Sequence, residues 1–306
     1  MRTAHLAAAI GVLAVLTTGC SAVTNSAHGS PGPVDVTSIP MMTTAKDKTL
    51  PIEDYLLNGR QMAQVQNAIN ILEVRCMARF GYTYAPLTPN LDSPITQTVR
   101  RYGATDLSVA SSYGYHAPAG FSADKSGQPT LTDEERQVLT GGLEPGQIKA
   151  SPSQSAKTAA NGQSVPYGGC TQEATGKVQP GRGMKEAELA DDINLGDYQR
   201  SIEDPRVKKA FAAWSSCMKE KGYSYPSPMD AMNDRKWAAS SPSPEEIATA
   251  TADLECKSKN NVIGIWFAVE SALQRHDIDA KIDSLTKVKD DIQSALKRAA
   301  DVTAEK

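Results

Sequence analysis

The sequence predicts a mainly α-helical protein with two disulfide-stapled modules, long loops and a long C-terminal helix. Three observations predict this fold. Apolar residues recur at helical spacing before Cys76 and again before Cys217. A motif of the form Cys-Met-x-x-x-Gly-Tyr-x-Tyr occurs at both places, which indicates an internal repeat. From Glu245 to the C-terminus the chain contains no Pro, so a long helix is possible there.

Composition excludes some function classes. The 306 residues include 32 Lys and Arg against 35 Asp and Glu. This near-neutral balance, without basic runs, argues against a nucleic-acid partner. The 22 Gly and 18 Pro predict long loops around a modest core.

Residues 1–19 have the form of a signal peptide: Arg2 precedes a short apolar stretch, and Gly19 precedes Cys20. The stretch is too short to span a bilayer. The site resembles the lipobox of bacterial lipoproteins, although Thr17 stands where Leu is usual. The resemblance implies that Cys20 carries a lipid that includes palmitate. It also implies that the protein lies on the outer face of the bacterial cytoplasmic membrane. Release by an ordinary signal peptidase is the alternative.

Residues 20–48 are rich in Ser, Thr, Pro and Gly, which predicts a flexible tether. Two modules are expected beyond it, at 49–196 and 197–306. Export to an oxidising compartment favours disulfides. Because each motif is followed by one further Cys, we predict that Cys76 pairs with Cys170 and that Cys217 pairs with Cys256.

The repeated motif has the form of a helix stop. Gly81 and Gly222 are expected to be the left-handed residues just beyond two helix ends. The Tyr that follows each Gly should then pack against the Met near the end of the same helix. This interpretation needs no ligand.

In the first module, three tyrosines lie in Gly-punctuated loops and offer a candidate surface for a sugar or peptide: Tyr102, Tyr113 and Tyr115. Thr132 begins a capping box that predicts a short helix. Residues 144–183 are expected to form a long loop.

In the second module, Asp204-Pro205 and Ser243-Pro244 each have the form of a helix start. The second helix is expected to run toward Val302 with at most a kink, Gly264 being its only Gly. Apolar residues follow at spacings of three and four, as a narrow seam: Ile278, Ile282, Leu285, Val288, Ile292, Leu296 and Ala299.

Such a seam requires a neighbouring helix. One hypothesis is that an envelope protein docks on four of its residues, namely Ile282, Leu285, Ile292 and Leu296. The alternative is that the seam folds back on the helix expected within residues 52–79.

No pattern predicts a reaction. His116 and His276 lack metal-ligand spacing, and no phosphate loop or nucleophile elbow is present, so no metal or cofactor is expected. Glu270 lies in the most apolar helical stretch, where burial would raise its pKa. Pairing with Arg275 or capping by hydrogen bonds is favoured over a role as general acid.

The lipobox, residues 50–55, Arg101-Tyr102-Gly103, the repeated motif and residues 266–271 together resemble uncharacterised exported lipoproteins of actinomycete type. The resemblance covers most of residues 50–300 and implies location and fold without a site. We expect a lipid-anchored, non-catalytic envelope protein that binds another envelope component. The alternative is a module that binds a small ligand or a cell-wall fragment through the tyrosines, and an enzyme is the least favoured class.

Overall fold

The computed structural model describes residues 34–92, 96, 98–118, 129–142, 161–180 and 185–305. Cys20, the leader and the first part of the expected tether lie outside these residues. Within the described ranges the chain is helical and forms no sheet, which confirms the predicted fold class. None of the described helices is both long enough and apolar enough to cross a bilayer.

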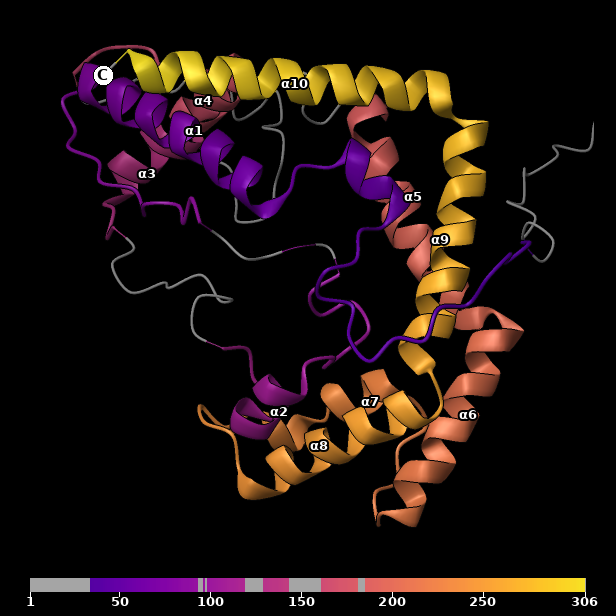
Figure 1. The fold of residues 1–306 in the computed structure, drawn as a ribbon. Helices are drawn as coiled ribbons and strands as arrows, with labels where there is room; N and C mark the ends of the chain where they lie inside the picture. The colour runs from indigo at the N-terminus through magenta and orange to yellow at the C-terminus, as the bar shows by residue number, and fades with distance from the viewer. Residues whose placement is uncertain are drawn as a thin grey trace, which may run out of the picture. The chain divides into compact units, whose positions relative to one another are not determined.

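Figure 1 shows the order of the helices along the chain. They are η1 (Pro51–Tyr55), α1 (Gly59–Arg79), α2 (Leu107–Tyr113), α3 (Asp133–Thr140), α4 (Gly169–Val178), α5 (Lys185–Glu203), α6 (Pro205–Glu220), α7 (Pro228–Met232), η3 (Arg235–Trp237), α8 (Pro244–Lys259), α9 (Val262–Ala280) and α10 (Ile282–Ala304). The expected starts at Thr132, Asp204 and Ser243 are all N-caps, each of whose side chains accepts a backbone hydrogen bond.

The first Cys-containing helix, α1, packs against α4 and α10 (Figure 1). Val65, Ala68 and Ile69 of α1 are buried against Ala174 of α4 and Ala299 of α10. Their spacing of three and four places them on one helical face. The second Cys-containing helix, α6, packs in the same manner against α8 and α9.

The core around α6, α8 and α9 is aromatic. The Trp214 and Trp266 side chains are fully buried, and the Trp266 ring meets Tyr102 and Phe211 edge-on at centroid distances of 5.1 and 5.0 Å. Aromatic pairs at such distances and angles contribute stability beyond the area that they bury. Most of residues 262–273 of α9 are buried in this core.

The two motif copies are not separate domains. The boundary expected between residues 196 and 197 lies inside α5, and residues 34 to 306 form one compact unit. Helix α5 packs against α9 and α10, and η1 packs against the same two helices. The repeat predicts the two bridged helix pairs, but packing between them makes a continuous body.

The long helix expected from Ser243 toward Val302 is divided into α8, α9 and α10. Asn261 adopts a left-handed conformation with φ 46°, which Asn tolerates better than most residues. Lys281, with φ −129°, separates α9 from α10. The division lets α9 pack on α6 while α10 packs on α1, which one straight helix would not do. The long C-terminal helix is therefore α10 alone.

Residues 20–48 are expected to form a flexible tether, and this prediction is wrong for residues 34–48, the part that the structure describes. The Met42 and Ala45 side chains are buried in the same cluster as Trp266. Gly264 explains the close approach, because a Cβ at that position would lie 2.0 Å from the Pro40 carbonyl oxygen. The only Gly of α9 is therefore a contact site for the N-terminal segment.

Candidate functional site

Both copies of the repeated motif are helix stops, as predicted. Gly81 and Gly222 are left-handed, with φ 86° and 89°. The Tyr82 amide donates to the Met77 carbonyl at 3.1 Å, and the Tyr223 amide donates to the Met218 carbonyl at 3.0 Å. These are the long hydrogen bonds of a Schellman motif, which occupy carbonyls that the helix leaves unpaired.

The predicted disulfides are also confirmed. Cys76 is bridged to Cys170 and Cys217 to Cys256, with Cα–Cα distances of 5.6 and 5.7 Å. The first bridge joins α1 to α4 and the second joins α6 to α8. Each closes a helix pair whose first member ends in the repeated motif.

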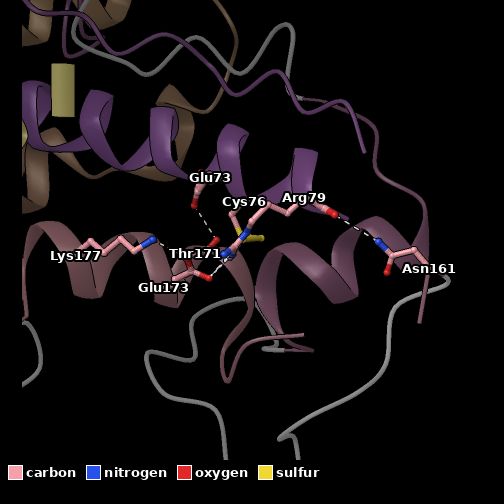
Figure 2. The surroundings of a disulfide bond; sticks show 8 residues. Glu73, Cys76, Arg79, Asn161, Thr171, Glu173 and Lys177 are labelled. Carbon is pink, nitrogen blue, oxygen red and sulfur yellow. Dashed lines mark hydrogen bonds and ion pairs between the residues drawn. A yellow bond between two sulfur atoms is a disulfide. The ribbon is translucent and has the colours of Figure 1, made fainter. Parts of the chain in front are cut away.

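Figure 2 shows the charged residues around the Cys76–Cys170 bridge. Arg79 Nη2 lies 3.1 Å from Cys76 Sγ and 2.5 Å from Glu173 Oε2. Lys177 pairs with the other Glu173 oxygen at 2.7 Å. The Arg79–Glu173 pair links α1 to α4, the two helices that the bridge joins, and the Lys177–Glu173 pair lies along α4. The four bridge cysteines are all buried.

Glu270 is the most deeply buried acid of α9, and its partner is Arg101. Arg101 Nε donates to Glu270 Oε1 at 2.5 Å, and the Tyr102 hydroxyl donates to Oε2 at 2.8 Å. Burial raises the pKa of the Glu270 carboxyl, while the Arg101 charge and both hydrogen bonds oppose the rise. The expectation of a buried, hydrogen-bonded carboxylate is confirmed.

The pairing of Glu270 with Arg275 is wrong, because Arg275 is exposed whereas Glu270 is fully buried. The α9 residue that does reach Glu270 is Gln274, whose amide donates to Oε1 at 3.3 Å. Arg101 has a further acceptor, the Asn194 carbonyl of α5, at 2.6 Å. A loop residue thus joins α5 to α9.

The tyrosine surface suggested by the sequence is not formed. Tyr102 is fully buried and Tyr115 is 4% exposed, so neither can contact a ligand in this conformation. Only Tyr113 is open to solvent, at 42%. The hypothesis of a binding surface made of these three residues is therefore wrong, because two of them belong to the core.

A second buried ion pair lies within α8, between Asp253 and Lys257. Lys257 Nζ is 2.9 Å from Asp253 Oδ2 and donates to the Ala104 carbonyl at 2.8 Å. Trp214 Nε1 donates to Asp253 Oδ1 at 2.9 Å. Burial raises the pKa of Asp253 and lowers that of Lys257, and their attraction opposes both shifts. Asp and Lys four residues apart share a helical face, a signal that the sequence interpretation did not use.

His116 bridges two acceptors beside this pair. Its Nδ1 lies 2.7 Å from Glu246 Oε1, and its Nε2 lies 2.7 Å from the Ala239 carbonyl oxygen. The hydrogen bond to the Ala239 carbonyl raises the pKa of His116 most, and the hydrogen bond to Glu246 raises it further. Gly114 is required nearby, because a Cβ there would lie 2.7 Å from Glu246 Oε1 and its φ is 57°.

Arg200 joins α5 to α9 near the surface, through Asp197 and Asp277. Burial raises the pKa of Asp197 to about 6 despite the Arg200 charge. His276 Nδ1 contacts its neighbour Asp277 at 2.9 Å, and its side chain is 57% exposed.

The apolar seam of α10 faces the chain itself. Leu285 is fully buried against Leu50 and Ile52, and Leu296 packs with Val65 and Ile69 of α1. Ile292 is partly buried in the first of these clusters, and Ile282 is 45% exposed. The hypothesis that the four seam residues face an envelope partner is wrong, and the alternative that the seam folds back on α1 is confirmed.

Three surface depressions lie away from these buried pairs. One of about 520 Å³ follows α1 beside Pro86, one of about 650 Å³ lies beside Leu107 at the start of α2, and one of about 390 Å³ lies between Met62 and α10. None of the three is lined by Glu270 or by the Asp253–Lys257 pair. The described residues hold no group of three or more His, Cys, Asp or Glu side chains that could bind a metal ion.

No protein-family model matches the chain, and no curated protein or solved structure is significantly similar to it. The resemblance to exported actinomycete lipoproteins stays a prediction.

Proposed function

We propose that this chain is a lipid-anchored, non-catalytic protein of the bacterial envelope that binds another envelope component. The observation that carries the proposal is the pair of buried disulfides, Cys76–Cys170 and Cys217–Cys256. Bridges of this kind persist in oxidising compartments and are rare in the cytosol. A short apolar leader that ends at Gly19-Cys20 gives the route out of the cytoplasm and the site of the lipid.

The location of the buried charges supports a non-catalytic role. Active sites gather groups with shifted pKa values in a cleft that a substrate can enter. Here Glu270 is paired with Arg101, and Asp253 is paired with Lys257, inside the core. None of the three surface depressions is lined by Glu270, Asp253 or Lys257. The Arg101–Glu270 pair joins the loop before α2 to α9. The Asp253–Lys257 pair lies within α8, and its further hydrogen bonds reach the Ala104 carbonyl and Trp214 of α6. Both tasks are structural.

Cell fractionation tests the location. The wild type is expected in the membrane fraction, with no thiol that reacts with a maleimide until a reductant is added. The Cys20→Ser variant is expected to leave the membrane fraction while its bridges still form. A wild-type protein found in the cytosol with free thiols would contradict the proposal.

Photo-crosslinking in intact cells tests the binding role. A photoreactive amino acid is placed at Leu195, which is 62% exposed on α5, at Tyr113, or at Ile282. If the chain binds an envelope component, at least one of these positions gives a discrete crosslinked species with that component. This species is expected to be lost in cells that carry Cys20→Ser. The absence of any discrete species from all three positions would contradict a partner-binding role.

A further inference from the structure

Residues 34–42, here called the N-terminal strap, are fastened to the ends of two helices. The Val34 carbonyl accepts hydrogen bonds from both Arg206 Nη atoms, at 3.3 and 3.2 Å, at the start of α6. Asn261, just before α9, donates to the Pro40 carbonyl at 2.9 Å and accepts from the Met42 amide at 3.0 Å. In Figure 1 the strap is the indigo segment that crosses the lower end of α9.

The strap exposes two large apolar side chains. Met42 is 6% exposed, whereas Ile39 is 44% and Met41 is 79% exposed. Residues 37–41 are all exposed, so Ile39 and Met41 lie in one open stretch that ends at the buried Met42. No other large apolar side chain of the described residues is as open to solvent as Met41.

The position of the strap in the sequence points to what covers these side chains. Val34 lies 14 residues after Cys20, the residue proposed to carry the lipid. At about 3.3 to 3.6 Å per residue, that length reaches at most about 50 Å. Because the strap is fastened, the tether enters the body at this point. A tethered surface meets the membrane at a high effective concentration, so a weak apolar contact is sufficient to orient the body.

We propose that the strap is a membrane-contacting surface, in which Ile39 and Met41 insert into the lipid bilayer that holds the Cys20 anchor. The proposal rests on the lipid anchor of the proposed function. It assigns these two side chains to phospholipid, and it places the ends of α6 and α9 at the membrane. Two apolar side chains alone give a marginal, reversible contact, which the anchor converts into a fixed orientation.

A fluorescent label tests the contact. The native cysteines other than Cys20 are bridged, so Met41→Cys in the lipidated chain provides one free thiol for an environment-sensitive dye. The protein is placed in vesicles of phosphatidylglycerol and phosphatidylethanolamine. Its emission is expected to shift to the blue, with at least a threefold loss of quenching by aqueous iodide. Met62→Cys, also an exposed Met but on α1, is the matched control and is expected to show neither change.

Equal iodide quenching of the label at 41 with and without vesicles would overturn the proposal. Shielding of that label before vesicles are added would also overturn it, because a second copy of the chain would then cover the strap. Mass spectrometry of the same preparation separates the two claims. If Cys20 carries its lipid and residue 41 stays open, the membrane contact fails while the anchor stands; if the lipid is absent and the protein does not bind vesicles, both fail.

The double variant Ile39→Ser, Met41→Ser provides a second test that leaves the core intact, since both side chains are exposed. With the dye at Ser38→Cys, the lipidated parent is expected to be shielded in vesicles and the double variant open. Equal shielding of both would show that the apolar side chains do not make the contact.

Discussion

Replacing Arg101 by Met removes the charge that Glu270 needs in the core. Glu270 is fully buried and the Arg101 side chain is 8% exposed, so water is not available to solvate the carboxylate that remains. Removing one partner of such a pair costs about 3 to 5 kcal/mol, because an uncompensated charge stays buried. Met keeps much of the volume of the Arg side chain, which limits the contribution of a cavity.

The assay is urea unfolding of the mature chain with Cys20→Ser and both bridges intact, followed by circular dichroism. Arg75→Met is the matched control, since Arg75 and its partner Glu305 are 43% and 66% exposed. An exposed pair contributes about 0 to 1 kcal/mol, so this control should stay within that range.

The pH dependence makes the test specific. Without Arg101, the raised pKa of Glu270 rises further, so the carboxyl takes up a proton in the folded state at a higher pH than in the unfolded state. The penalty in Arg101→Met is therefore full above the folded pKa of Glu270 and shrinks as pH falls through that pKa. A loss no larger than that of Arg75→Met, or one that does not change with pH, would refute this reasoning.

Three further predictions concern other contacts. Burial raises the pKa of Asp197 from 3.8 to about 6; this shift predicts that stability falls by about 3 kcal/mol as pH rises through that window, and that Asp197→Asn removes most of the fall in urea titrations. His116 has a raised pKa, so the stability from its two hydrogen bonds is complete below its ordinary value of 6.5 and is lost as pH rises through the folded pKa. Melting temperatures measured across pH should show this loss in the wild type and not in His116→Gln. An unchanged pH dependence in the variant would mean that another group causes the loss. Gly264→Ala places a methyl group against the Pro40 carbonyl and should cost about 1 to 3 kcal/mol, whereas Gly176→Ala, with no atom within 4 Å, should be neutral or stabilising in the same unfolding assay.

The parts of the fold that the sequence predicts are local. Gly81 and Gly222 are identified by their place after an amphipathic helix, and the bridges follow because each motif precedes one further Cys. Helix starts at Thr132 and Ser243 are equally local, since the cap side chain and the backbone amide that donates to it lie three residues apart. Each of these patterns is fixed by chemistry within a few residues.

The parts that it does not predict depend on distant residues. Arg101 and Glu270 are 169 positions apart, and neither residue type indicates the other. The breaks at Asn261 and Lys281 follow from tertiary packing, because no Pro marks them and Asn is only weakly disfavoured in a helix. The seam of α10 predicts that a helix covers it, but not that this helix belongs to the same chain.

The central claim is that the chain is anchored by lipid on Cys20 and stands in an oxidising compartment. Its most direct test is intact and peptide mass spectrometry of protein extracted from membranes without reductant. We predict an N-terminal peptide that begins at Cys20 and carries acyl chains, together with peptides that join Cys76 to Cys170 and Cys217 to Cys256. An unmodified N-terminus at another residue, or free thiols at those four cysteines, would contradict the account.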